Sequence, residues 1–208
     1  MRRVLNYITV LSFAFCSATL QGQPKYGQII GINLSSMSYT TGEKSYVPCI
    51  SPGIHFGGFL ELQLKKHLSF KPALIFTAKG SSYKTDSSQF SISPIYAEIP
   101  VNILVSFGSG DIKLTFYAGP YIACGIGGNS LPSGGTFQNL NFGSGAQDDI
   151  RRFDLGFNAG AGLNIRGFLV SAQYGESLIN LSPPAKRDTE LKNRVTGISV
   201  TMPLAGRQ

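Results

Sequence analysis

The ionisable residues that could do chemistry stand inside segments in which apolar and polar residues alternate. His55, Glu61, Lys71, Glu98 and Asp154 all occupy the polar positions of these segments. An imidazole, three carboxylates and an ammonium group could exchange protons as general acids and bases. They could equally neutralise one another as a buried structural network. We favour the structural network, in which Lys71 pairs with Glu61 or Glu98, and we expect Glu98 to lie close to Lys71.

Catalysis has little support beyond these residue types. A lipid-modifying enzyme would need His55 beside a serine or an acid on an accessible wall, and such triads are recognised by geometry rather than by sequence order. Cys, His and carboxylate residues show no metal-ligand spacing. The glycine-rich segments at 125–128 and 133–145 lack the Lys-Ser or Lys-Thr of a phosphate-binding loop. The sequence therefore predicts no catalytic residue, no metal ion and no cofactor.

Composition narrows the protein class. The 208 residues include 25 Gly and 11 Pro, which disfavours a helical protein, and 42% are hydrophobic, which disfavours disorder. The formal net charge of +7 is spread along the chain instead of being clustered among aromatic residues. We therefore expect no nucleic-acid partner.

The N-terminus has the pattern of a secretory signal peptide over residues 1–22. Arg2 and Arg3 precede an apolar run at 8–16, and small residues follow it. Export predicts a single mature domain over residues 23–208, located outside the cytoplasm.

Two cysteines, Cys49 and Cys124, lie in the predicted mature domain. An exported protein can form a disulfide, but two cysteines do not define a disulfide framework. We favour two separate thiols, with a Cys49–Cys124 disulfide as the alternative.

The elements that must position the ionisable residues are strands. In residues 153–165 every odd position is apolar and every even position is small or polar, the pattern of a strand with one apolar face. Its small inner residues leave room for larger side chains from opposite strands. Seven further segments alternate in the same way: 28–36, 53–64, 68–79, 95–107, 113–125, 168–175 and 195–202.

Connections between these eight segments alternate strictly between long and short. Such sorting places all long loops at one end, as in outer-membrane barrels with short periplasmic turns. The short connections are 65–67, 108–112 and 166–167, and the long ones are 37–52, 80–94, 126–152 and 179–194.

Charge distribution identifies the face that meets lipid. The apolar faces of the eight segments carry no Asp, Glu, Lys or Arg, whereas Lys79 and Lys113 join the five ionisable residues on the other face. A soluble ligand-binding barrel would place apolar residues inside and charges outside. The sequence therefore predicts an all-β fold, an eight-stranded antiparallel up-and-down transmembrane β-barrel in the bacterial outer membrane, monomeric and without an open pore.

Six short motifs support a family resemblance. They are Gly-Ile-Asn-Leu-Ser at 31–35, Pro-Gly-Ile-His-Phe-Gly at 52–57, Phe-Lys-Pro-Ala-Leu at 70–74, Tyr-Ala-Glu-Ile-Pro-Val at 96–101, Ala-Gly-Pro-Tyr at 118–121 and Lys-Asn-Arg-Val at 192–195. In type and order they resemble the PorT-like outer-membrane β-barrel family of the Bacteroidetes. This resemblance implies an accessory role in protein secretion linked to gliding.

From the residues themselves we expect a non-enzymatic protein with a structural or interaction role through its long loops, because loops on a rigid scaffold are common binding surfaces. Its expected partners are outer-membrane lipids and envelope or secretion proteins. The alternatives are the secretion role, a lipid-modifying enzyme and a soluble ligand-binding barrel.

Overall fold

A computed structural model of the chain describes residues 23–41, 44–46, 48–85, 88–132, 135–186 and 189–204. The predicted signal peptide, residues 1–22, lies outside these described residues. No helix that is long and apolar enough to cross a membrane occurs among them. Eight long strands make up most of the described chain: β1 (Lys25–Thr41), β3 (Pro48–Lys65), β4 (Leu68–Ala78), β6 (Ser88–Phe107), β7 (Ile112–Leu131), β9 (Phe153–Ile165), β10 (Phe168–Ser177) and β11 (Thr189–Pro203).

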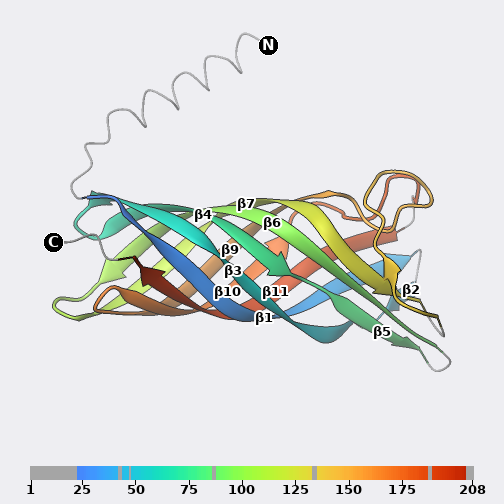
Figure 1. Cartoon of the computed structure of the whole chain (residues 1–208), viewed down its shortest axis with the longest axis horizontal. Helices are drawn as coiled ribbons and strands as arrows, with labels where there is room; N and C mark the ends of the chain where they lie inside the picture. Colours follow the sequence, from blue (N-terminus) through green and yellow to red (C-terminus); the bar gives the residue numbers. More distant parts are fainter. Residues whose placement is uncertain are drawn as a thin grey trace, which may run out of the picture.

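The eight long strands form one closed ring (Figure 1). Their order around the ring is β1, β11, β10, β9, β7, β6, β4 and β3, and every neighbouring pair is antiparallel. Strand β1 closes the ring because Ile32 is the register partner of Ile198 on β11 and of Ile54 on β3. The predicted eight-stranded up-and-down barrel is confirmed.

Side chains alternate between the two faces of this wall as the sequence predicts. Ile32 and Ile54 are each 62% exposed, whereas their chain neighbours Asn33 and His55 are 1% and 2% exposed. Phe153 and Asp154 show the same contrast on β9. A closed wall with apolar side chains outside and polar side chains inside satisfies every ladder hydrogen bond without exposing a sheet edge to lipid.

The strands extend well beyond the segments that the sequence marks, which corrects the predicted long loops. Strand β1 continues to Thr41, β6 begins at Ser88 and β7 continues to Leu131. Hydrophobic alternation fades where the strands leave the apolar layer, but the backbone pairing continues, as in the pair Ser82 and Ser91. Three short strands also lie within the predicted long loops: β2 (Lys44–Tyr46), β5 (Ser81–Thr85) and β8 (Gln138–Asn139).

The two ends of the barrel differ. Short turns close one end, at the left of Figure 1, and residues such as Arg166 (φ 51°) and Gly167 (φ 94°) adopt the left-handed conformation that a tight turn requires. Both ends of the described chain also lie here, since the Leu204 N–H donates to the Tyr26 carbonyl at 2.9 Å. We call the opposite end, where β2, β5 and the long connections gather, the mouth.

Candidate functional site

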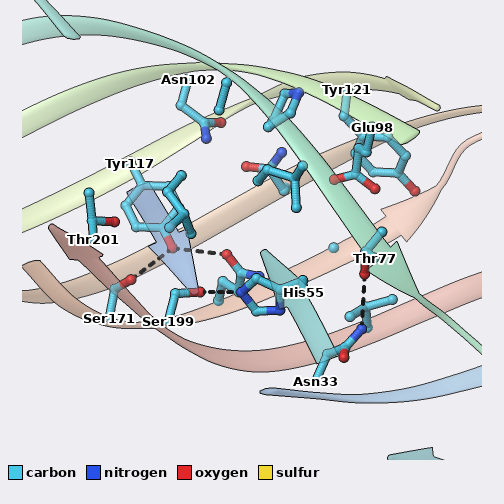
Figure 2. Close-up of a pocket in the computed structure, with 18 of the residues that line it drawn as sticks. Asn33, His55, Thr77, Glu98, Asn102, Tyr117, Tyr121, Ser171, Ser199 and Thr201 are labelled. Atoms are coloured by element: carbon cyan, nitrogen blue, oxygen red, sulfur yellow. Dashed lines mark hydrogen bonds between the residues drawn. The ribbon is translucent and has the colours of Figure 1, made fainter. Parts of the chain in front are cut away.

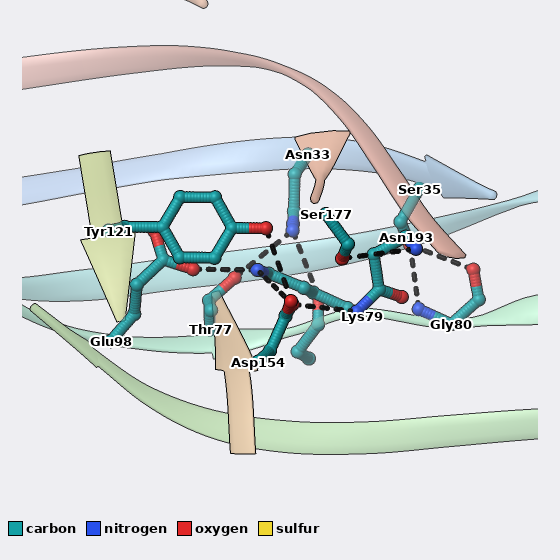
Figure 3. A network of polar contacts seen from close by, with 11 residues as sticks. Asn33, Ser35, Thr77, Lys79, Gly80, Glu98, Tyr121, Asp154, Ser177 and Asn193 are labelled. Carbon is teal, nitrogen blue, oxygen red and sulfur yellow. Dashed lines mark hydrogen bonds and ion pairs between the residues drawn. The ribbon is translucent and has the colours of Figure 1, made fainter. Parts of the chain in front are cut away.

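A polar cluster inside the barrel is centred on Lys79, the residue that follows β4. Its Nζ lies 2.6 Å from Glu98 Oε2 on β6 and 3.8 Å from Asp154 Oδ2 on β9 (Figure 3). The side chains of Lys79, Glu98 and Asp154 are only 4%, 13% and 0% exposed. The Lys79 backbone N–H donates to the Pro94 carbonyl, which fixes this lysine against β6.

This cluster contains two carboxylates and one ammonium group, and neutral hydrogen-bond donors stabilise the excess negative charge. Asp154 Oδ2 accepts hydrogen bonds from the Tyr121 hydroxyl at 3.3 Å and from Asn193 Nδ2 at 3.1 Å. The Lys79 ammonium lies 4.5 Å from the centre of the Tyr121 ring, a cation–π distance. Since the contributing residues belong to or adjoin β4, β6, β7, β9 and β11, the cluster crosses the lumen. We call these five residues the Lys79 cluster.

A second set of polar contacts lies inside the barrel, farther from the mouth (Figure 2). His55 Nε2 lies 2.8 Å from Ser199 Oγ, and Lys71 Nζ donates to Thr201 Oγ1 at 3.3 Å. The Lys71 ammonium also lies 4.6 Å from the centre of the Phe59 ring. These contacts link β3 and β4 to β11 across the inner face of β1, so they hold together the strands on either side of β1.

The five residues singled out from the sequence do not form one cluster. Glu98 and Asp154 meet through Lys79, whereas His55 and Lys71 bond separately to β11. Glu61 is half-buried. Its carboxylate attracts the Lys71 ammonium group, but the described contacts include no direct ion pair between the two residues.

Glu98 forms its ion pair with Lys79, and among the described residues no ion pair joins it to Lys71. Lys71 is the register partner of Asn102, four residues beyond Glu98, and Lys79 bonds to Pro94, four residues before it. Both lysines are therefore equally distant from Glu98 along β6, and the side chain of Lys79 is the one that turns toward it. The sequence does contain one indication of this ion pair, because position 79 falls on the inward-facing side of the segment 68–79.

Little free space remains among these side chains. The lumen contains a cavity of about 70 Å³, which has room for a few water molecules. Six polar atoms of lumen residues have no partner among the described protein groups: Asn33 Oδ1, Tyr96 Oη, Asn102 Oδ1, Asp154 Oδ1, Asn158 Oδ1 and Asn193 Oδ1. Buried polar atoms of this kind are normally hydrogen-bonded to internal water.

An apolar cluster lies farther toward the mouth along β1 and β11. Met37 and Tyr83 are fully buried in it, and the Tyr83 hydroxyl donates to the Met37 carbonyl at 2.7 Å. Burial raises the pKa of the Tyr83 phenol above its ordinary value, so this hydroxyl stays a donor. The cluster, which we call the cap cluster, consists of Met37, Tyr83, Leu140, Ile150, Leu181 and Leu191.

The alternative of a disulfide is not realised in the structure, where Cys49 and Cys124 are both free thiols. Cys49 is exposed on β3 opposite Ser82, and Cys124 is half-buried on β7 opposite Ala97 and Phe153. Among the described residues, no group of three or more His, Cys, Asp or Glu side chains could hold a metal ion.

Comparison with known proteins places this barrel in a family. The family model of the outer membrane protein beta-barrel domain matches residues 21–182. No match was found among curated proteins.

Among solved structures, the chain is similar to neisserial surface protein A, with 12% identity, coverage of 87% of this chain and 99% of that chain, and a TM-score of 0.44. It is similar to Ail, the attachment invasion locus protein of Yersinia pestis, with 12% identity, coverage of 87% and 100%, and a TM-score of 0.42. For Ail this TM-score comes from its complex with the heparin analogue sucrose octasulfate. The N-terminal β-barrel domain of Pseudomonas aeruginosa OprF gives 12% identity, coverage of 86% and 99%, and a TM-score of 0.31.

The family match covers more than half of the chain, and the closed ring of eight strands with an apolar outer face is the architecture that this family name describes. The chain therefore belongs to the outer membrane protein beta-barrel domain family and is a protein of the bacterial outer membrane.

Proposed function

We propose that the protein is a non-enzymatic, non-conducting barrel with a structural or interaction role, exercised through the connections at its mouth. The observation that carries this proposal is the Lys79 cluster, which spans the lumen and leaves a cavity of only about 70 Å³. Short turns of such barrels face the periplasm, so the mouth faces the outside of the cell.

Ion conductance of the purified mature protein in planar lipid bilayers tests this proposal. We expect the wild-type protein to give no resolved channel openings, and the double variant Lys79→Ala/Glu98→Ala to give them, because both ends of the 2.6 Å ion pair are then removed. A shift in gel mobility on heating reports that each barrel is folded. A silent wild type beside a conducting variant supports the proposal, and stable openings of the wild type overturn it.

The position of His55 argues against a lipid-modifying enzyme. His55 and Ser199 form a hydrogen-bonded pair, as a base and a nucleophile would, but they are 2% and 3% exposed. No hydrogen bond among the described residues links His55 to an orienting carboxylate, the third member of such a triad. We expect the protein to leave phospholipids and lipid A unchanged. A lipid product formed by the wild type but not by Ser199→Ala would overturn the non-enzymatic assignment.

A second candidate is an accessory role in Bacteroidetes protein secretion, which the motif resemblance to PorT-like proteins favours. The motifs at 96–101 and 118–121 lie on neighbouring strands, and Pro100 is the register partner of Tyr121. Together they supply Glu98 and Tyr121 to the Lys79 cluster, so the two motifs lie side by side in the barrel wall. Co-purification of secretion components from native outer membranes would support this role. Normal secretion and gliding in a deletion strain would exclude it.

A further inference from the structure

A pocket of about 370 Å³ opens at the mouth, between β1, β6, β7, β8, β11 and the connections that follow β7, β8 and β10. We call it the mouth pocket. Its volume lies within the range of small-molecule sites and is too small for a folded partner. Tyr39, Phe90 and Leu191 form its apolar side and pack on or belong to the cap cluster. The cap cluster therefore holds the apolar side of the pocket in place.

Polar groups line the other side of the mouth pocket. Ser182 is 3% exposed, and its Oγ has no hydrogen-bond partner among the described protein groups. Its backbone is held on both sides, because the Ser182 N–H donates to Asn180 Oδ1 at 2.9 Å and Arg151 Nε donates to the Ser182 carbonyl at 2.8 Å. A buried hydroxyl that has no partner among the protein groups normally binds an ordered water, and at a pocket wall a ligand hydroxyl can take the place of that water.

The charges of the mouth pocket favour an uncharged ligand. Among the described residues that line it, the charged ones are one carboxylate, Asp149, and one ammonium group, Lys186, which offset each other. Asp149 Oδ2 accepts a hydrogen bond from the Asn141 N–H, and Lys186 Nζ donates to the Asp148 carbonyl, so both side chains are anchored and keep further hydrogen-bonding capacity. A phosphate or sulfate would meet the carboxylate, and an acyl chain would leave these polar groups unpaired.

We propose that the mouth pocket binds a neutral sugar ring. A sugar ring presents C–H groups on its face, which fit the aromatic side of the pocket, and hydroxyl groups at its edge, which fit Ser182, Asp149 and Lys186. Phe90 is stacked on Tyr83 at 4.6 Å between ring centres, so its ring is held in place to receive that face. This inference rests on the proposed interaction role of the mouth and specifies its ligand class.

Saturation-transfer NMR on the mature protein, folded in a detergent without a sugar headgroup, tests the proposal with D-glucose, D-galactose and N-acetyl-D-glucosamine as probes. We expect binding of at least one of the three to the wild type. Ser182→Ala should weaken it about fivefold, as the loss of one hydrogen bond does. Phe90→Leu, which keeps an apolar group but removes the ring, should also weaken it.

Ser93→Ala is the matched control, because Ser93 is exposed on β6 and does not line the mouth pocket; we expect wild-type affinity. Unchanged thermal stability of Ser182→Ala shows that its loss of binding is not a loss of folding. Absence of transfer from all three sugars to the wild type overturns the sugar site, as does equal affinity of Ser182→Ala and the wild type. The conductance experiment is independent of both outcomes, so failure of the sugar site and failure of a closed barrel are distinguished.

Discussion

Lys79 carries a positive charge inside the lumen, although its side chain is only 4% exposed. Its ammonium group stands between two carboxylates that are almost fully removed from water, Glu98 and Asp154. Removal of one partner from such a group leaves an uncompensated buried charge, which costs far more than the net stabilisation that the pair provides.

We expect Lys79→Met to lower the free energy of unfolding by about 3–5 kcal/mol, because it leaves Glu98 and Asp154 unpaired. Chemical unfolding of the detergent-folded protein, followed by the heat-dependent gel shift, measures the loss. Arg166→Ala is the control, since the ion pair of Arg166 with Asp111 is 77% and 68% exposed and should contribute little. Equal stability of the two variants would show that the Lys79 cluster does not hold the lumen together.

The small inner residues of β9 make room for aromatic side chains of the adjacent strand, not of opposite strands as the sequence suggested. Tyr121 on β7 is the register partner of Gly156, and Tyr117 is the partner of Gly160. A Cβ atom built on either glycine would collide with the ring of that tyrosine. Covering a strand glycine with a cross-strand aromatic ring is a recognised way of fixing strand register.

Gly156→Val should therefore destabilise the barrel by about 1–3 kcal/mol through overpacking. Displacement of Tyr121 also removes the hydroxyl that donates to Asp154. The control is Gly127→Ala, because a Cβ atom at Gly127 meets no atom within 4 Å. Thermal unfolding of the two variants compares them directly, and a Gly156→Val barrel as stable as wild type would contradict this packing.

Among the elements, the connections at the mouth are held by the cap cluster, which also includes Met37 of β1 and Leu191 of β11. Leu181 and Ile150 come from two different connections, and both are fully buried. The Arg151 N–H donates to the Leu181 carbonyl at 2.8 Å, which ties the two connections together. The two connections therefore stabilise each other, and the Leu181 N–H, which donates to the Leu191 carbonyl at 2.8 Å, also ties them to β11.

We expect Leu181→Ala to make residues 178–186 sensitive to added protease while the barrel keeps its heat-dependent gel shift. Loss of a buried leucine side chain costs about 2–5 kcal/mol, and this loss falls on the connections. Leu178→Ala is the control, because Leu178 lies in the same segment but is 65% exposed. Protease resistance equal to that of the control would mean that the connections are held by other contacts.

The eight strands could be predicted from sequence because each meets lipid on one side and the lumen on the other. The predicted and observed bounds of the strand at 153–165 are identical. Beyond the apolar layer this constraint ends, so Ser88–Ser93 reads as a loop although it pairs with β5 and β7.

The lumen was predicted less completely than the wall. The alternation of residues predicts which side chains point into the lumen. Which of these side chains bind each other depends on how far each one reaches across the ring of strands. Lys71 and Lys79 lie four residues on either side of the level of Glu98, and only side-chain direction decides between them. The cap cluster had no sequence signal, because Leu140, Ile150 and Leu181 stand in segments without periodicity.

At the scale of the whole molecule, the barrel depends on an uninterrupted apolar surface. Ile198 lies in the middle of β11, is 55% exposed and stands between Ile32 and Ala172 of the neighbouring strands. The exposed side chains around it are apolar because hydrocarbon surrounds them.

Ile198→Lys should therefore cost about 2–4 kcal/mol at the middle of the bilayer and reduce the yield of folded protein in the outer membrane. Thr196→Lys, on the same face of β11 but nearer the mouth, is the control and should cost less. Folding yields into lipid vesicles compare the two. An equal penalty at both positions would mean that this face of β11 does not follow the depth of the bilayer.

The strands that continue past the apolar layer give the mouth a property that free loops lack. Pairings such as Tyr39 with Leu191 and Ile92 with Ser130 lie next to or within the mouth pocket. A ligand that arrives there meets a preorganised surface, so little conformational entropy is lost on association and a small contact area suffices for selective recognition.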